Sequence, residues 1–320
     1  MKRIGVVTSG GDAPGMNAAI RAVVRIAYSK DFHALGFKRG WEGLITNTST
    51  VLTPRSVGGI LQLGGTILNT SRSPQFRKRD GIEKTAETLA SNNVEGLIVI
   101  GGGGSFKGAL ELSRETDTMI VGIPATIDND VFGTDETIGF DTAVNTAVKE
   151  IDKIRDTAIS HERVFAVEVM GRRRGFLALT VGLTVGAEII LVPEVKYAED
   201  DIFKTLRENS AKGKKSGIIV VAEGVAHVSR LVGEIEENTG AEVRLSILGY
   251  AQRGGSPTAR SRLLANLFAN KAVELLSREQ GNKIVGLHKG RITSIDLEKS
   301  CKTEKPLNLK LLKLANILAT

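Results

Sequence analysis

Short apolar segments rich in Ile and Val recur along this chain, each followed by Gly, Pro or charged residues and then by a helical pattern. The strand candidates are residues 4–8, 97–100, 119–123, 164–170, 188–192 and 218–222. The helix candidates are residues 16–28, 106–112, 143–158 and 262–276, and the third of these repeats its apolar residues with the 3.6-residue period of a helix. Alternation of nearly continuous apolar strands with helices predicts parallel sheets that are covered on both faces.

The length of the chain and the spacing of its C-terminal leucines give two further predictions. A chain of 320 residues is long enough for two domains. In residues 304–320, Leu307, Leu311, Leu314 and Ile317 are spaced as on one side of a helix. We therefore expect a short amphipathic helix over residues 304–320.

The charge of the chain predicts anionic partners. Its formal net charge is +7, but the basic residues are dispersed, and one Trp and three Tyr offer few rings for bases to stack on. We therefore favour small anionic ligands over nucleic acid. A single cysteine, Cys301, an N-terminus without a signal-peptide pattern and no apolar run of about 18 residues predict a cytoplasmic protein without a membrane partner.

Two glycine-rich turns follow strand candidates, at residues 10–15 and 101–105. Neither is a Walker loop or a dinucleotide fingerprint, because Met16 and Asn17 replace the Lys and hydroxyl of the first and no third glycine completes the second. Glycines at a strand-to-helix turn still let backbone N–H groups approach a phosphate. A polyphosphate site is one interpretation, and two ordinary tight turns are the other.

The segment 126–130 places two acids and an amide directly after a strand candidate, as Asp128, Asn129 and Asp130. A kinase needs a carboxylate within hydrogen-bonding reach of the acceptor hydroxyl, and a second acid can help to hold a metal. Taken alone, the pattern is also that of a polar turn. Further on, residues 170–175 and 252–257 place arginines beside glycines after strands, where their guanidinium groups can pair with phosphate oxygens.

Together these loops resemble the bacterial ATP-dependent 6-phosphofructokinase family over nearly the whole chain. The matching blocks are residues 8–19, 124–130 with Ala125 at the position of a family glycine, 139–143, 168–172 and 252–257. The resemblance implies an α/β fold of two similar three-layer domains with mainly parallel sheets and the active site in the cleft between them. It implies a nucleotide-binding domain of residues 1–139 plus about 252–303 and a fructose 6-phosphate domain of about 140–251 plus 304–320.

The implied reaction is the glycolytic transfer of the ATP γ-phosphoryl group to the 1-hydroxyl of fructose 6-phosphate, with Mg²⁺. By position, Asp128 is the general base, Thr126 and Asp130 lie beside it, and Arg172 stabilises the transferring group. ATP would contact Gly11, Arg72, Ser73, Gly102, Gly103, Gly104 and Ser105. Fructose 6-phosphate would contact Thr126, Asp128, Met170, Gly171, Arg172, Glu223, Tyr250 and Arg253, and Arg163 and Arg244 would reach in from a neighbouring subunit.

The resemblance also implies regulation and assembly. The expected effector is ADP or phosphoenolpyruvate, bound between the subunits of a homotetramer. The residues that match this site are Arg21, Arg25, Arg155, Glu188, Lys212 and Lys214, with Lys212 at a position where Arg is usual. For any one of these cations, a solvated helix face is the alternative interpretation.

The most consequential departure from the family pattern is Gly103. The family has an Asp here that helps to bind the Mg²⁺ of the nucleotide, so the usual metal ligand is absent and Asp130 is the remaining candidate. Tyr250 stands where a His usually contacts the sugar phosphate. Small residues at Gly104 and Ala125, where pyrophosphate-using relatives carry Asp and Lys, favour ATP as the donor.

These departures leave several functions open. An active ATP-dependent kinase is the leading hypothesis. Because of Gly103, a weakly active or non-catalytic regulatory paralogue of the same family is the alternative. A different ketose phosphate as acceptor and a nucleic-acid-binding role are more distant possibilities.

Overall fold

The structure is a computed structural model that describes residues 2–319. The chain folds into two compact units of helices and strands, which we describe separately. Unit 1 is Met1–Thr142 with Arg253–Lys305, and unit 2 is Ala143–Gln252 with Pro306–Thr320. The predicted α/β class with mainly parallel sheets is confirmed.

Unit 1 is built on one eight-stranded sheet. Its main order is β12-β11-β5-β4-β1-β2-β3, and the short β6 pairs with β5. Only β2–β3 and β11–β12 pair antiparallel. The strands are β1 Arg3–Ser9, β2 His33–Phe37, β3 Ser49–Leu52, β4 Gly96–Gly101, β5 Met119–Thr126, β6 Ile138–Gly139, β11 Lys283–His288 and β12 Arg291–Asp296.

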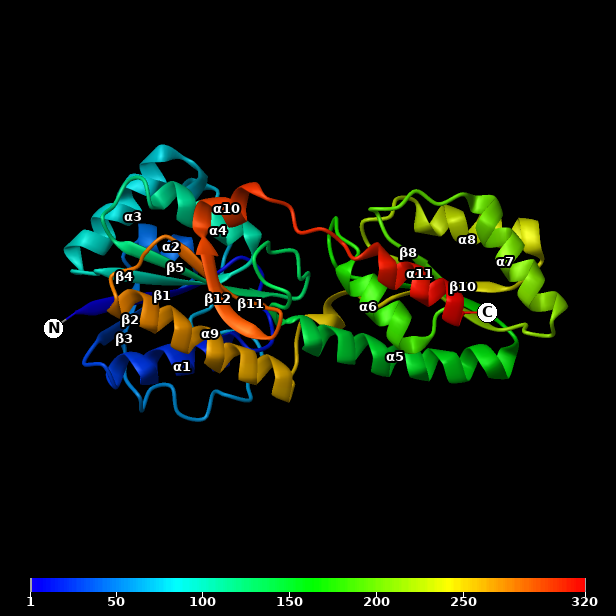
Figure 1. Cartoon of the computed structure of the whole chain (residues 1–320), viewed down its shortest axis with the longest axis horizontal. Coiled ribbons are helices and arrows are strands. Elements are labelled where there is room, and N and C mark those ends of the chain that lie inside the picture. The colour runs from blue at the N-terminus through cyan, green and yellow to red at the C-terminus, as the bar shows by residue number, and fades with distance from the viewer. Residues whose placement is uncertain (1, 320) are drawn as a thin grey trace. The chain divides into compact units, whose positions relative to one another are not determined.

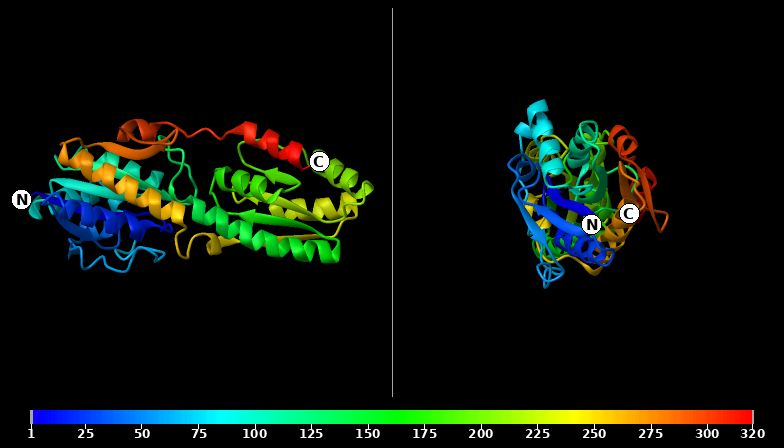
Figure 2. Two further views of the ribbon diagram at one scale, coloured as in Figure 1. Left: turned by 60° about the horizontal axis from the view of Figure 1, so that its bottom comes forward. Right: turned by 90° about the vertical axis from the view of Figure 1, so that its left-hand side faces the viewer.

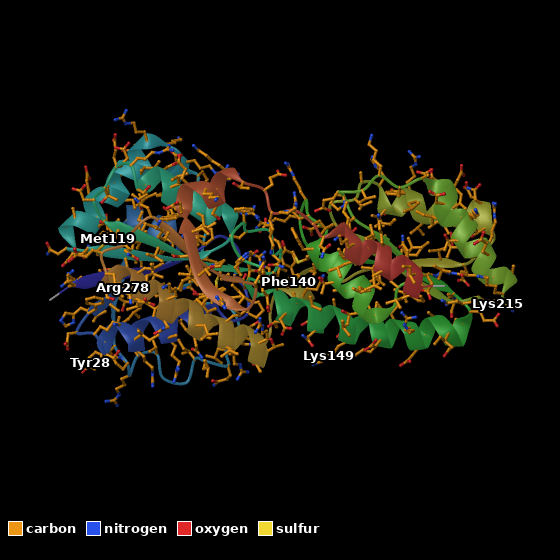
Figure 3. The ribbon with its side chains drawn as sticks, viewed as in Figure 1. Tyr28, Met119, Phe140, Lys149, Lys215 and Arg278 are labelled. Carbon is orange, nitrogen blue, oxygen red and sulfur yellow. The ribbon has the colours of Figure 1, made fainter. Side chains whose placement is uncertain are left out.

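Helices cover both faces of the sheet of unit 1. On one face lie α1 (Met16–Tyr28) and α9 (Ala259–Ser277), which pack along each other (Figure 1). On the other lie α2 (Trp41–Ile45), α3 (Arg79–Ser91), α4 (Gly103–Leu112) and α10 (Leu297–Lys302), with a 3-10 turn at Gln75–Arg77. Figure 3 marks Tyr28 and Arg278 at the ends of α1 and α9, where both side chains reach solvent. All six residues of β4 are buried, as the covered parallel sheet requires.

Unit 2 has a smaller sheet in which all pairs are parallel, in the order β10-β7-β9-β8. Its strands are β7 Val164–Val169, β8 Ile189–Leu191, β9 Gly217–Ala222 and β10 Val243–Ile247. α6 (Phe176–Val185) packs on β8 and β9, α7 (Glu199–Ala211) packs with α8 (Val228–Thr239), and α11 (Leu309–Leu318) lies on α6 (Figures 1 and 2). α5 (Phe140–His161) starts at the end of unit 1 and continues through unit 2, and a 3-10 turn covers Gly249–Gln252.

The predicted C-terminal helix exists but is shorter than residues 304–320, since it covers Leu309–Leu318. α11 begins at Leu309, after Pro306 and after Asn308, whose side chain accepts a hydrogen bond from the N–H of Lys310 at 3.2 Å. Leu307 lies outside the helix, and the side chains of Leu311, Leu314 and Ile317 are exposed. Leucine spacing identified a helix here, but it did not identify a buried face.

The predicted glycine turn at 101–105 also differs from the structure, because Gly103 already begins α4. The register of the sheet then explains where the loops meet. Ser9 pairs with Gly101, and Gly101 pairs with Pro124, so β1, β4 and β5 end at the same edge of the sheet. In parallel sheets this carboxyl edge is where ligands bind. Among residues 2–319 no helix has both the length and the apolar character needed to cross a bilayer.

Candidate active site

The two glycine turns of unit 1 are fastened to each other. The Ser105 hydroxyl donates to the carbonyl oxygen of Ser9 at 2.8 Å, across the β1–β4 pair. A Cβ on Gly101 would lie 2.5 Å from the same carbonyl oxygen, so no side chain fits there. The turn after β1 is held from another side by Thr70, whose hydroxyl donates to the carbonyl oxygen of Gly10 at 2.7 Å.

The second turn faces the segment 126–130. A Cβ on Gly102 would lie 3.3 Å from Cβ of Thr126, whereas a Cβ on Gly103 or Gly104 would meet no atom within 4 Å. The first turn of α4 carries no acidic residue. Its free backbone N–H groups and the helix dipole therefore present positive potential to an anion near Thr126.

Arg253 lies over the first turn. Its Nε is 3.2 Å from both the carbonyl oxygen and Oδ1 of Asp12, and a Cβ on Gly11 would lie 1.8 Å from its Nη2. Gly11 is therefore needed to let this guanidinium approach the backbone. Arg253 was predicted to bind the sugar phosphate, and the structure places it in unit 1, against the glycine turn.

Beside the first turn is an open groove of about 740 Å³, lined by Asp12, Arg39 and residues 64–66 and 69–71. No sequence motif surrounds Arg39, so its place in this groove could not be predicted from the sequence. The predicted nucleotide residues lie next in sequence: Arg72 is exposed, and the Ser73 hydroxyl donates to Glu42 at 2.7 Å. Nearby, the rings of Trp41 and Phe76 stack with their centroids 4.2 Å apart.

The proposed base lies in a buried, braced loop. Asp128 and Asn129 are 4% and 5% exposed, and Asn129 has a left-handed backbone with φ 51°. The Thr137 hydroxyl donates to the carbonyl oxygen of Thr126 at 2.6 Å, and the N–H of Asp128 donates to the Thr126 hydroxyl at 3.2 Å. These bonds fix the start of the loop relative to β5 and β6.

Lys305 braces the rest of this loop, and no sequence motif points to it. Its Nζ donates to the carbonyl oxygen and to Oδ1 of Asn129 at 2.8 and 2.9 Å, and to the carbonyl oxygen of Asp135 at 3.1 Å. Burial lowers the pKa of Lys305 to about 8, and the neighbouring Asp135, Asp130 and Glu136 oppose this shift.

The residues at this edge fit a magnesium ion that is held mainly by nucleotide. Within residues 2–319 no three His, Cys, Asp or Glu side chains form a cluster that could hold a metal. Asp128 and Asp130 supply hard oxygen donors from one loop, and Gly103 supplies none. Mg²⁺ is commonly held by one or two carboxylates together with phosphates and water, so the donor set is short but adequate.

In unit 2 the loop that carries Arg172 is held by its backbone. Gly171 and Arg172 both have positive φ, 134° and 55°, and the N–H of Arg172 donates to Oε1 of Glu223 at 2.5 Å. Glu223 follows β9, and its own N–H donates to the carbonyl oxygen of Val169 at 2.9 Å. The Arg172 side chain is exposed and Met170 is partly buried.

Glu168 and Tyr250 lie near the same end of the small sheet. Burial, and then the charge of Glu223, raise the pKa of Glu168 above its ordinary value. Tyr250 lies in the 3-10 turn after β10, and its side chain is 79% exposed. Tyr250 is thus available to a ligand from solvent.

Arg163 and Arg244, both predicted to reach a neighbouring subunit, lie close together because Val164 pairs with Val243. Arg163 Nε lies 2.8 Å from Glu242, and Arg244 also bonds to Glu242. The hydrogen bond from Arg163 is the largest cause of a lowered pKa of Glu242. In the isolated chain both arginines are therefore paired with one acid.

The predicted effector residues fall in both units. Arg21 and Arg25 lie on α1 in unit 1, and the other four lie in unit 2. The buried Glu188 pairs with Lys214 at 2.8 Å and accepts from the N–H of Ile218 at 2.6 Å. Arg155 donates to the carbonyl oxygen of Val185 at 2.6 Å, and Lys212 is exposed at the end of α7.

Comparison with known proteins gives one consistent answer. The family model described as Phosphofructokinase matches residues 3–276. The chain is 48% identical to "ATP-dependent 6-phosphofructokinase" of Halothermothrix orenii and 49% identical to "ATP-dependent 6-phosphofructokinase 1" of Thermus thermophilus, and each match covers 100% of both chains.

A solved structure of phosphofructokinase from Saccharomyces cerevisiae superposes with a TM-score of 0.88 at 35% identity. That match covers 94% of this chain and 45% of the yeast chain. Since the family model spans most of the sequence and the curated relatives match from end to end, this chain belongs to the phosphofructokinase family.

Proposed function

We propose that this chain catalyses the ATP-dependent phosphorylation of the 1-hydroxyl of fructose 6-phosphate, a step of glycolysis. The observation that carries the proposal is the buried, braced Asp128 loop beside the free N-terminus of α4, because phosphoryl transfer needs a base and a phosphate site close together. The names of the full-length relatives favour this activity over a non-catalytic paralogue.

Unit 1 is proposed to bind the nucleotide and to supply the base. The backbone N–H groups at the start of α4 and beside Gly11 would hold the phosphates, with Arg72 and Ser73 beside them. Asp128 would accept the proton of the 1-hydroxyl as the oxygen attacks the γ-phosphorus and the bond from that phosphorus to the bridging oxygen breaks, which releases ADP. The Thr126 hydroxyl accepts a hydrogen bond from the backbone N–H of Asp128 and so holds the backbone at the start of this loop.

Unit 2 is proposed to bind the sugar phosphate and to offset the charge of the transferring group. Arg172 is the proposed cation, because its guanidinium can pair with phosphate oxygens and Glu223 accepts a hydrogen bond from its backbone N–H. Met170, Gly171, Glu223 and Tyr250 would contact the sugar, and Arg253 would contribute from unit 1. Arg163 and Arg244 would leave Glu242 to serve the site of a neighbouring subunit.

Mg²⁺ is the proposed cofactor, with Asp130 as its protein ligand and the nucleotide phosphates as the others. When bound, it would neutralise charge on the phosphates. We further propose a cytoplasmic homotetramer regulated by ADP or phosphoenolpyruvate at Arg21, Arg25, Arg155, Glu188, Lys212 and Lys214.

A coupled assay for fructose 1,6-bisphosphate tests the proposed function. The purified chain is given fructose 6-phosphate with ATP, GTP or pyrophosphate in turn, over a wide range of Mg²⁺ concentration. We expect turnover with ATP and little or none with pyrophosphate. Absence of turnover with every donor would overturn the proposal.

A further inference from the structure

The Asp128 loop has two differently supported halves. Its first half continues β5, where the pairing of Thr126 with Gly139 and the Thr137 hydroxyl fix the backbone. Its second half turns sharply at Asn129, whose left-handed backbone is uncommon for a residue other than glycine. Such a conformation persists only where the surroundings determine it.

Lys305 is the residue whose hydrogen bonds hold Asn129 in this conformation. Its ammonium donates to both acceptor oxygens of Asn129, and it also donates to the carbonyl oxygen of Asp135. Asn129 Nδ2 donates to the same Asp135 oxygen at 3.1 Å, so one carbonyl joins the lysine and the amide. The result is a closed network around the turn that carries the acids.

We propose that Lys305 is a positioning residue for phosphoryl transfer, which holds the Asn129 turn and thereby sets the orientation of the neighbouring Asp128. This inference rests on the proposed role of Asp128 as the base. Lys305 need not touch either substrate, and it acts through the loop.

The electrostatics of the contact favour this role over one in stability alone. A partly buried ammonium loses hydration, and the hydrogen bonds of Lys305 to Asn129 and Asp135 go to uncharged carbonyl and amide oxygens, while the charges of Asp135, Asp130 and Glu136 offset the loss only in part. This loss of hydration disfavours the charged form and is the main cause of the lowered pKa of Lys305. Residues with pKa values shifted by burial are often found at functional sites, where a fixed side-chain geometry is needed for the reaction.

The place of Lys305 in the chain adds a second reason. It is the last residue of unit 1, and Pro306 begins the segment that leads to α11 in unit 2. Residues 304–308, between α10 and α11, form neither helix nor strand. The ring of Pro306 fixes its own φ angle and limits the backbone conformations of the preceding Lys305. Fewer backbone conformations of Lys305 are therefore available in which its side chain could leave the Asn129 turn.

The test compares Lys305→Met, Lys305→Arg and Lys302→Met in the full-length chain. Lys302 lies three residues earlier on α10, is exposed and pairs with Glu298 at 2.7 Å, so its variant is the matched control. We expect Lys305→Met to lower kcat about 10–50-fold while KM for ATP and fructose 6-phosphate changes less than about 3-fold. Lys305→Arg should recover most of kcat, and Lys302→Met should match wild type.

The melting temperature of each variant separates positioning from folding. If Lys305→Met does not fold, Lys305→Gln takes its place with the same expected change in kcat. Retention of kcat within about 2-fold, or a uniform loss that Lys305→Arg does not recover, would overturn the inference. Asp128→Ser, assayed in parallel, tests the proposed base itself: a mild effect there refutes the base, whereas an inactive Asp128→Ser beside a fully active Lys305→Met refutes only the role of Lys305.

Discussion

The Asp128 loop of unit 1 and the Arg172 loop of unit 2 both follow the carboxyl end of a parallel strand, yet they are built in opposite ways. Asp128 is 4% exposed, and side chains from other elements brace its loop. The Arg172 residue is exposed, and its backbone N–H donates to Glu223. A general base must keep one orientation relative to its substrate, whereas a long cation can approach a phosphate after it has bound.

Replacement of Asp128, the proposed base, should have the largest effect and would break this comparison most directly. We expect Asp128→Ser to lower kcat about 10³-fold, because serine cannot accept the proton of the sugar hydroxyl. Steady-state kinetics with both substrates varied will measure it. A loss below about 10-fold would show that the buried loop has a structural role and does not supply the base.

Removal of the exposed cation should have the next largest effect. Arg172→Ala should lower kcat about 10²-fold, since it removes the cation that is proposed to offset charge on the transferring group. Arg173→Ala is the matched control, because Arg173 is the adjacent exposed arginine on the same loop. If both variants lose activity equally, the positive charge of the loop matters and the position of Arg172 does not.

A third prediction concerns the buried brace of unit 1 and uses pH. The pKa of Lys305 is lowered to about 8 in the fold, so between pH 8 and 10.5 the unfolded chain binds more protons than the native chain. Native stability should therefore rise with pH over this window relative to Lys305→Met, by at most about 3 kcal/mol.

Urea unfolding of wild type and Lys305→Met at pH 7, 8.5 and 10 measures this difference. The acidic groups that face the ammonium are Asp135, Asp130 and Glu136, and they are the same in wild type and Lys305→Met. A difference in the free energy of unfolding that does not change with pH would mean that Lys305 titrates near its ordinary pKa.

The sequence identifies the buried strands of this fold well and its edges poorly. β1, β4, β5 and β9 are continuous apolar runs because helices cover both faces, and such runs are visible without a structure. The partly exposed β3 and β12 lack that signal. The C-terminal leucines gave a helix at roughly the right place, but their exposure depends on packing that spacing does not encode.

In the candidate site, too, some features are visible in the local sequence and others depend on the whole fold. The strand followed by two acids at residues 126–130 is visible locally, but taken alone it is also the pattern of a polar turn, and only the family resemblance singles out Asp128. The brace could not be predicted, since Lys305 and Asn129 are 176 positions apart and their contact depends on the whole fold of unit 1. The same holds for Glu242, which brings Arg163 and Arg244 together across a strand pair.

The smallest effect is expected from a substitution at Gly103, at the start of α4, where the nucleotide phosphates are proposed to bind. A side chain at Gly103 would meet no atom within 4 Å, and the backbone there is not left-handed, so Gly103→Asp should fit without strain. An acid in the first turn of α4 also suits the helix dipole. We expect Gly103→Asp to lower the Mg²⁺ concentration for half-maximal activity about 3–10-fold, since it adds a hard oxygen ligand.

Gly103→Asn separates charge from size in this experiment, because the amide has nearly the shape of the carboxylate without its charge. If Asp and Asn give the same Mg²⁺ dependence, the gain comes from shape and the added carboxylate does not bind the metal. If neither variant differs from wild type, Asp130 and the nucleotide phosphates already satisfy the ion. In that case the edge of unit 1 works with acids from the Asp128 loop alone, and the bracing of that loop serves the metal as well as the base.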